Sequence, residues 1–379
     1  MLTLPTSLYI HMPWCIKKCP YCDFNSHAQK GEIPEKAYID QLIVDLKTQL
    51  LYLQNRPIHS IFIGGGTPSL FSPAAYAQLF KALRAYLSIS DEIEITLEAN
   101  PGAIDAEKFK GYFDAGINRL SIGVQSFQNT QLKKLGRIHE SDQARDAVLL
   151  ARQAGFKRIN IDLMFGLPDQ SIDDALFDLT EATTLQPTHI SWYQLTIEPN
   201  TFFHRFPPTL PDDDIRFEIQ KAGQDFLAKS CFKQYEISAY AISPKEQSQH
   251  NLNYWLFGDY FGIGAGAHAK LTNLKNSQMI RRSNKKHPTQ YLQATENNLF
   301  EEKIISQSEL PLEFMMNILR LNQAIPVELF TSRTGLNLNV IQKQLDQAEK
   351  LNLLFIKNNA FNLTQRGRLF LNDVLELFL

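Results

Sequence analysis

A strand-and-helix repeat is the feature that most constrains the fold of this chain. Short runs rich in apolar and β-branched residues recur at intervals of about 30 residues after a longer first gap, a spacing typical of βαβ units. The runs are Ser7–Met12, Ser60–Gly64, Ile93–Ala99, Arg119–Gln125, Arg158–Met164 and His189–Thr196. Amphipathic helical segments separate them, among them Tyr38–Leu53, Ala74–Leu87, Ala106–Ala115, Gln143–Ala154 and Ile172–Leu185. Because βαβ connections are right-handed, we expect an α/β protein with a partial (βα)6 TIM-like barrel.

The strands alternate polar and apolar residues, which is unusual for a parallel sheet because helices or a packed core normally cover both of its faces. In Ile93–Asn100 the odd-numbered positions are apolar and the even-numbered positions, Glu98 among them, are polar. The next two runs repeat the pattern and place Gln125 and Asp162 on their polar faces. We predict that the apolar faces meet the helices and that the polar faces line a cavity for a large polar ligand. The alternative is a half-exposed sheet.

The repeat weakens after about residue 200, where Pro207, Pro208 and Pro211 mark a break. Asp212–Asp214 predict the start of a helix that runs to about Lys229. We interpret 258–268 as a glycine-rich turn and the basic stretch 281–287 as a solvated loop.

Beyond about residue 307, helices and a hairpin of Leu353–Ile356 and Ala360–Leu363 indicate a small winged-helix-like C-terminal domain. We expect residues 1–235 to form the barrel, 236–305 a connecting segment and 306–379 this C-terminal domain.

Composition excludes several classes of protein. The 38 Lys and Arg residues are balanced by 40 Asp and Glu residues, and this net charge of −2 gives no support to a nucleic-acid-binding surface. The sequence contains no run of about 18 apolar residues, so it predicts no transmembrane helix. Its first residues lack the features of a signal peptide. Only four cysteines occur, too few for a disulfide scaffold. We therefore expect the reducing cytoplasm as the compartment.

Three of the four cysteines lie within eight residues, in the segment Cys15-Ile-Lys-Lys-Cys19-Pro-Tyr-Cys22. Three thiolates on one short loop can bind three irons of a 4Fe-4S cluster and leave the fourth iron open for a small molecule. We expect Cys231 to take no part. The alternative is a zinc site completed by a histidine such as His11 or His27.

The spacing and context of these cysteines resemble the radical S-adenosylmethionine (SAM) family, and within it the branch of the oxygen-independent coproporphyrinogen III oxidases. The matching segments cover almost the whole chain. They are Tyr9-Ile-His-Met-Pro-Trp-Cys15, Gly64-Gly-Gly-Thr-Pro68, Glu98-Ala-Asn-Pro101, Gly123-Val-Gln-Ser-Phe127, Asp162-Leu-Met-Phe-Gly-Leu-Pro168 and His250-Asn-Leu-Asn-Tyr-Trp255.

The resemblance implies a cluster on the three cysteines, with SAM chelating the open iron. It also implies the residues that contact SAM, which are Tyr9, Gly65, Gly66, Thr67, Glu98, Gln125, Arg137 and Asp162. In the oxidase the last three serve a second SAM. The chemistry of these residues also suggests roles without the resemblance. Gly64–Gly66 would let the backbone approach a ligand. Glu98 is suited to bind ribose hydroxyls or to form a buried salt bridge, and Arg137 is suited to neutralise a carboxylate.

His250 and Tyr254 would share one face of a helix, and both side-chain types ligate heme iron. Without a resemblance, a packing helix is the simpler interpretation. In the HemW heme chaperone subfamily, however, this motif is associated with heme.

Two departures from the oxidase favour the chaperone subfamily. Phe24 stands where the oxidase has a further cysteine, and the oxidase's N-terminal extension is absent. The resemblance then implies a chaperone that binds heme, a 4Fe-4S cluster and SAM and hands heme to respiratory membrane proteins. It also implies a cluster-dependent homodimer and a cytoplasmic location, peripheral to the membrane only through partners. The alternatives are an oxidase that decarboxylates coproporphyrinogen III, and a zinc-dependent structural or nucleic-acid-binding module.

Overall fold

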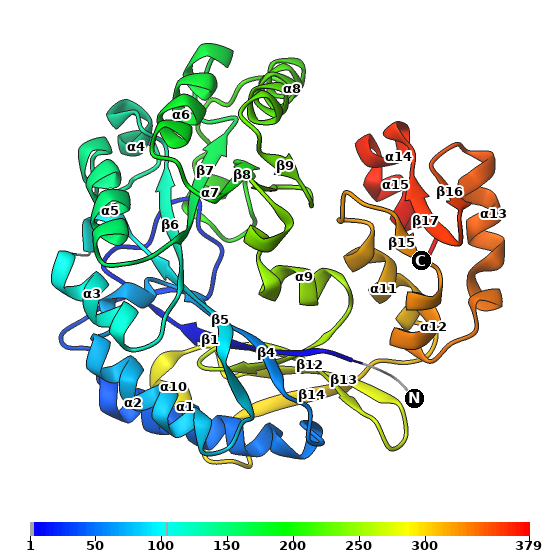
Figure 1. Cartoon of the computed structure of the whole chain (residues 1–379), viewed down its shortest axis with the longest axis horizontal. Helices are drawn as coiled ribbons and strands as arrows, with labels where there is room; N and C mark the ends of the chain where they lie inside the picture. Colours follow the sequence, from blue (N-terminus) through cyan, green and yellow to red (C-terminus); the bar gives the residue numbers. More distant parts are fainter. Residues whose placement is uncertain (1–3, 104) are drawn as a thin grey trace.

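The computed structural model describes residues 4–103 and 105–379. Its centre is a twelve-stranded sheet in the order β14-β13-β12-β11-β1-β4-β5-β6-β7-β8-β10-β9. Six consecutive parallel strands of this sheet match the predicted repeat. They are β1 (Thr6–Met12), β4 (Ile58–Gly65), β5 (Ile89–Ala99), β6 (Arg119–Gln125), β7 (Arg158–Phe165) and β8 (His189–Gln194). The sheet curves without closing (Figure 1), so the prediction of a partial barrel is confirmed.

Helices cover the outer face of these strands, as Figure 1 shows. They are α1 (Glu35–Gln49), α2 (Pro73–Arg84), α3 (Ala106–Asp114), α4 (Asn129–Lys134), α5 (Ser141–Gln153), α6 (Ile172–Thr184) and α8 (Asp213–Lys229). The helix predicted after residue 211 is confirmed, with Asp212 as its N-cap accepting a hydrogen bond from the Ile215 N–H. One core cluster joins the apolar strand faces to the helices, so the half-exposed sheet is excluded.

The sheet continues past β1 through segments that the sequence interpretation left as turn and loop. Strand β11 (Asp259–Ile263) pairs parallel to β1, and β12 (His268–Asn273), β13 (Gln278–Asn284) and β14 (Phe300–Ile304) follow antiparallel. The predictions of a glycine-rich turn at 258–268 and of a solvated loop at 281–287 are therefore wrong for most of these residues. Arg282 of β13 is fully buried, because its charge pairs with Asp45 of α1 at 3.1 Å.

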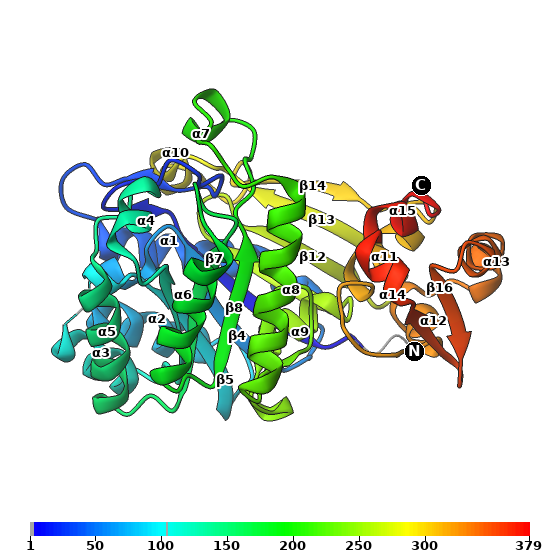
Figure 2. The same cartoon turned by 90° about the horizontal axis from the view of Figure 1, so that it is seen from above.

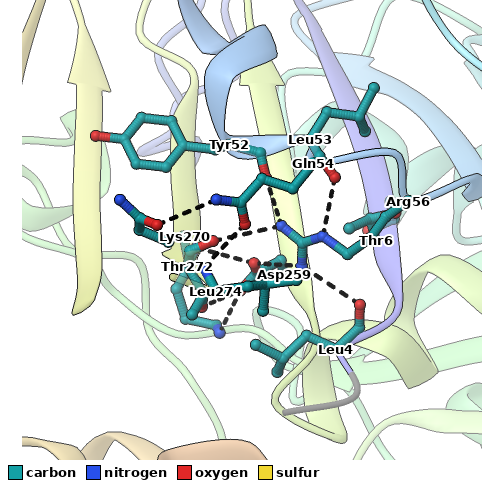
Figure 3. Close-up of polar contacts among 12 residues, drawn as sticks. Leu4, Thr6, Tyr52, Leu53, Gln54, Arg56, Asp259, Lys270, Thr272 and Leu274 are labelled. Atoms are coloured by element: carbon teal, nitrogen blue, oxygen red, sulfur yellow. Dashed lines mark hydrogen bonds and ion pairs between the residues drawn. The ribbon is translucent and has the colours of Figure 1, made fainter. Parts of the chain in front are cut away.

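A buried polar network ties this extension to the start of the barrel (Figure 3). The Asp259 carboxylate accepts hydrogen bonds from Arg56 Nη1 at 2.8 Å and from Lys270 Nζ at 3.0 Å. It also accepts from the backbone N–H and the hydroxyl of Thr272. Burial opposes the charge on Asp259, but the two cations outweigh it and lower the pKa of the carboxyl. The ionised Asp259 thus links the chain after α1 to β11 and β12.

The C-terminal part, at one end of the molecule in both views, forms a second core (Figures 1 and 2). Its elements are α11 (Leu310–Ile318), β15 (Ile325–Pro326), α12 (Glu328–Thr334), η5 (Leu338–Ile341), α13 (Gln342–Lys350), β16 (Leu354–Lys357), β17 (Ala360–Leu363), α14 (Gln365–Leu369) and α15 (Leu371–Glu376). The predicted hairpin is present as β16 and β17. Phe257 and Met279 from the preceding region belong to this second core.

Shorter elements complete the described chain. They are β2 (Trp14–Cys15), β3 (His27–Ala28), η1 (Leu50–Tyr52), η2 (Pro68–Leu70), η3 (Pro101–Ala103), α7 (Phe202–Arg205), β9 (Lys233–Gln234), β10 (Ala239–Ala241), η4 (Pro244–Glu246), α9 (Gln249–Trp255) and α10 (Pro288–Leu292). Among the described residues, no helix combines the length and the apolar character needed to cross a membrane.

Candidate functional site

The polar strand faces line a cavity of about 580 Å³, as the alternation predicted. Ten of the thirteen predicted site residues contribute to its wall: Cys15, Cys19, Cys22, Gly65, Gly66, Thr67, Glu98, Gln125, Arg137 and Asp162. The other three, Tyr9, His250 and Tyr254, line a second cavity of about 740 Å³. Gly65 and Glu98 border both cavities, so the two adjoin there.

The cysteine loop is held at both ends by backbone pairing. Strand β2, which ends at Cys15, pairs with β3 at the far side of the loop, and the Cys22 N–H donates to the Cys19 carbonyl at 3.2 Å. The Phe203 N–H of α7 donates to the Pro20 carbonyl at 3.0 Å, and α7 projects from the molecule next to this loop (Figure 2). Burial raises the pKa of the Cys15 and Cys22 thiols. Cys231 is exposed and lines neither cavity.

The donor set fits a 4Fe-4S cluster, because all three thiols face one cavity and each iron of a cubane takes one thiolate. In the part of the chain that the structure describes, no three His, Cys, Asp or Glu side chains gather as ligands of a single metal ion. His11, proposed as a fourth zinc ligand, has both ring nitrogens in use. Its Nδ1 bonds the Tyr9 hydroxyl at 2.9 Å, and its Nε2 bonds the Asn25 carbonyl at 2.8 Å.

The glycines at the end of β4 and directly after it are required by packing within the chain itself. Gly65 has a φ of +116°, and a Cβ there would lie 2.5 Å from the His11 ring. A Cβ on Gly66 would lie 2.5 Å from the Trp14 carbonyl oxygen. The atoms that exclude a side chain therefore belong to β1 and β2, whereas the sequence interpretation attributed the glycines to a ligand.

Glu98 and Asp162 form the acidic part of the first cavity. Burial, reinforced by the charge of Asp162, raises the pKa of Glu98 to about 8, although its Oε2 accepts a hydrogen bond from the Gly65 N–H at 3.0 Å. Burial also raises the pKa of Asp162, which accepts from the Ser121 hydroxyl and the Asn160 amide. Glu98 is therefore mostly protonated at neutral pH.

Arg137 lies against the cysteine loop rather than against a carboxylate. Its Nη1 contacts Cys19 Sγ at 3.5 Å and its Nη2 donates to the Gly123 carbonyl at 2.7 Å. Its buried Nε has no hydrogen-bond partner among the described residues. A guanidinium N–H without a partner beside the cluster loop fits an anionic group on a ligand, such as the SAM carboxylate. Gln125 accepts from the Tyr193 hydroxyl at 2.7 Å.

The predicted helix of His250 and Tyr254 is present as α9, and both side chains face the second cavity. The His250 ring packs 5.2 Å from Phe62 and 6.3 Å from Tyr9 between ring centroids. Burial, with a smaller effect of Arg119, lowers the pKa of His250 to about 3, so the imidazole is neutral. Neither ring nitrogen has a hydrogen-bond partner among the described residues, which suits a metal ligand.

Sequence reasoning missed several residues that line these cavities. Tyr193 and Ser191 lie on the polar face of β8, and the same alternation used for the earlier strands would have found them. Tyr260, His268 and Lys286 line the second cavity from the unpredicted sheet extension and the loop after it. No periodic signal marks these three, because their segments carry glycines and charges that indicate turns.

Comparisons with known proteins test the family resemblance that the sequence motifs indicated. A family model described as "Radical SAM superfamily" matches residues 9–179, and one described as "HemN C-terminal domain" matches residues 305–370. The chain is 51% identical to the heme chaperone HemW of Haemophilus influenzae over 99% of this chain and 98% of that protein. It is 49% identical to the HemW of Escherichia coli, again over 99% and 98%.

Among solved structures, the coproporphyrinogen III oxidase HemN of Escherichia coli superposes with a TM-score of 0.82 at 22% identity. This match covers 99% of this chain and 90% of the oxidase, and it shows a shared fold. The predicted family is confirmed: the chain belongs to the radical SAM superfamily and, within it, to the HemW heme chaperone family.

Proposed function

We propose that this protein is a heme chaperone that binds a 4Fe-4S cluster, SAM and heme. The observation that carries the proposal is the placement of His250. Its neutral imidazole, without a hydrogen-bond partner among the described residues, faces a cavity that adjoins the one lined by the three cysteines. The full-length similarity to relatives named as heme chaperones supports the proposal.

In this proposal the thiolates of Cys15, Cys19 and Cys22 hold the cluster. When bound, the cluster would supply an electron to SAM. Seven of the residues carried over from the family resemblance line the first cavity and would contact SAM there: Gly65, Gly66, Thr67, Glu98, Gln125, Arg137 and Asp162. Tyr9 would contact SAM from the second cavity.

His250 would ligate the heme iron, since a neutral imidazole is the form that binds a metal. Tyr254, one helical turn along the same face of α9, would flank the heme. Heme would pass from this cavity to respiratory membrane proteins. A homodimer, a cytoplasmic location with membrane contact only through partners, and the division at 1–235, 236–305 and 306–379 belong to the same proposal.

Titration with hemin tests the heme site. The wild-type protein should bind one equivalent and shift the heme absorption band, and His250→Ala should weaken the affinity by at least about tenfold because the iron ligand is lost. His204→Ala is the matched control, since His204 is exposed and lines neither cavity. Equal affinities for the two variants would contradict the role of His250.

Metal analysis tests the cluster site. After anaerobic reconstitution the protein should hold about four irons and show a broad thiolate-to-iron absorption band. Cys15→Ser, Cys19→Ser or Cys22→Ser should abolish the band, while Cys231→Ser should leave it unchanged. Stoichiometric zinc without iron would overturn the proposal. So would conversion of coproporphyrinogen III by the reduced protein with SAM, which would establish the oxidase alternative.

A further inference from the structure

The second cavity is lined by two chemically different groups of side chains. One wall is aromatic and contains Tyr9, His250, Tyr254 and Tyr260. The Tyr254 and Tyr260 rings lie 5.1 Å apart, and Tyr260 receives a hydrogen bond from Arg281 at 2.6 Å. The same cavity is lined by two exposed lysines, Lys18 and Lys286, which form its cationic rim. An aromatic wall and a cationic rim in one cavity match a planar ligand with acidic groups along one edge.

The rim has a positive balance at neutral pH. Asp23 and Glu98 are the only carboxylates that line this cavity within the described chain. Burial followed by the charge of Asp162 raises the pKa of Glu98 to about 8, so Glu98 is mostly uncharged. Lys18 donates to the Phe24 carbonyl at 3.0 Å. Lys286 makes no side-chain hydrogen bond or ion pair with any described residue and is exposed, so its charge is available to a ligand.

The backbone beneath Lys286 is fixed, so its charge has a defined position. The Asn25 side-chain amide donates to the Lys286 carbonyl and to the Ala265 carbonyl, each at 2.8 Å. The Asn25 carbonyl in turn bonds His11 Nε2. Gly266 lies so close that a Cβ there would be 2.3 Å from Asn25 Nδ2. These contacts join the loop that carries Lys286 to the cysteine loop that carries Lys18.

We propose that Lys286, together with Lys18, binds the propionate carboxylates of heme, with the porphyrin plane along the aromatic wall and the iron at His250. This inference rests on the proposed heme function and adds what orients the ligand. Charge-assisted hydrogen bonds from ammonium to carboxylate fix the direction of the porphyrin edge. Lys286 is the better residue to test, because Lys18 lies between Cys15 and Cys19 and its substitution would disturb the cluster loop as well.

The test compares hemin with hemin dimethyl ester, in which both carboxylates are masked. The wild-type protein should bind hemin about three- to tenfold more tightly than the diester, a range set by a partly exposed charged contact. Lys286→Glu should remove or reverse this preference. Lys285→Glu is the matched control, because it makes the same charge change at the neighbouring residue, which does not line the cavity. The control should keep the wild-type preference.

Several outcomes separate this inference from the proposed function. If hemin binds through His250 but the diester binds equally well, or Lys286→Glu behaves like Lys285→Glu, the inference is overturned and the proposed function stands. If wild-type hemin binding fails altogether, both are overturned. Lys286→Gln is the second variant should Lys286→Glu fold poorly, as judged by its thermal melting. It should lower the preference for hemin over the diester below the wild-type value, with Lys18 accounting for what remains, and a preference equal to that of the wild-type protein would overturn the inference.

Discussion

At the scale of single residues, the site combines groups whose charge is set by burial. Glu98 and His250 lie on the walls of adjoining cavities, and burial keeps both uncharged at neutral pH. An acid with a raised pKa gains its charge as pH rises, whereas a base with a lowered pKa gains its charge only in strong acid. The two groups therefore predict different pH responses.

We predict that SAM binding by the cluster-loaded protein strengthens as pH rises through the pKa of Glu98. If the ionised carboxylate accepts the ribose hydroxyls, a pKa of about 8 leaves roughly a tenth of Glu98 ionised at pH 7, so affinity should rise about tenfold from pH 7 to pH 9. Equilibrium binding over this range measures the effect. Glu98→Gln should show no such rise, and an identical rise in the variant would show that another group is responsible.

A second prediction concerns Gly65. Gly65→Ala should lower the free energy of unfolding by about 3 kcal/mol, because a left-handed backbone and a collision with the His11 ring are combined there. Gly116→Ala is the control: its φ of +106° is similar, but a Cβ there meets nothing within 4 Å, so about 1 kcal/mol is expected. Chemical denaturation measures both. Equal losses would mean that backbone strain alone requires glycine at residue 65.

At the scale of elements, Glu94 of β5 positions α9. Its Oε1 accepts hydrogen bonds from the Gln249 N–H at 2.9 Å and the His250 N–H at 3.3 Å. Its other oxygen forms an ion pair with Arg158 at 2.7 Å. A carboxylate at the first N–H groups of a helix is stabilising, because those groups have no partner within the helix. Glu94 thus holds the turn that carries the His250 side chain.

We therefore predict that Glu94→Ala weakens hemin binding by about fivefold, since the lost contacts free the start of α9. Iron content after reconstitution should stay unchanged, which separates positioning of α9 from general damage. Glu246→Gln is the control, because Glu246 also pairs with Arg158, at 3.3 Å, but is not among the acceptors of these α9 N–H groups. Equal hemin affinities of the two variants would contradict the role of Glu94.

At the scale of the whole molecule, buried ion pairs join helix α1 and the segment after it to the unpredicted part of the sheet. Asp259 links Arg56 to Lys270, and Asp45 links α1 to Arg282 of β13 (Figure 3 shows the first group). Removing one partner from such a group leaves uncompensated buried charge, which is more damaging than loss of an exposed pair.

Asp259→Asn should accordingly lower the free energy of unfolding by about 3–5 kcal/mol, because Arg56 and Lys270 lose their counter-charge. Asp40→Asn breaks the exposed pair with Lys36 and should cost less than about 1 kcal/mol. Because the folded pKa of Asp259 is lowered, its contribution is complete at neutral pH and is lost only as pH falls through that lowered value. Denaturation at pH 7 measures both, and similar losses would contradict the argument.

How much of this structure the sequence can predict depends on whether a local pattern exists. The six parallel strands have one, as do the three cysteines and the Asp212 helix start. Arg282 and Asp259 do not: each looks solvent-exposed in sequence, and each is buried because a partner more than 200 residues away, Asp45 or Arg56, neutralises it. Periodicity carries no information about such pairs, so β11–β14 stayed hidden.

The residues of the candidate site likewise divide into those that a local sequence pattern predicts and those that it does not. Glu98, Gln125 and Asp162 follow from strand alternation, and the resemblance adds the roles that alternation does not give. The rim of the second cavity comes from the cysteine loop, the start of β12 and the loop after β13, so Lys18, His268 and Lys286 meet only in three dimensions.

Helix α9 and the residue after it contribute both to the second cavity and to the C-terminal core, and this affects how roles can be assigned by truncation. His250 and Tyr254 face the cavity, while Leu252, Trp255 and Leu256 pack against the C-terminal core. Truncating the chain before residue 306 would remove the core against which those three apolar side chains pack. The position of His250 on the same helix would then be less well fixed. A truncated barrel that fails to take up heme would therefore reveal a disturbed support, not a heme ligand in the deleted part, and single substitutions are the sounder means of assigning roles.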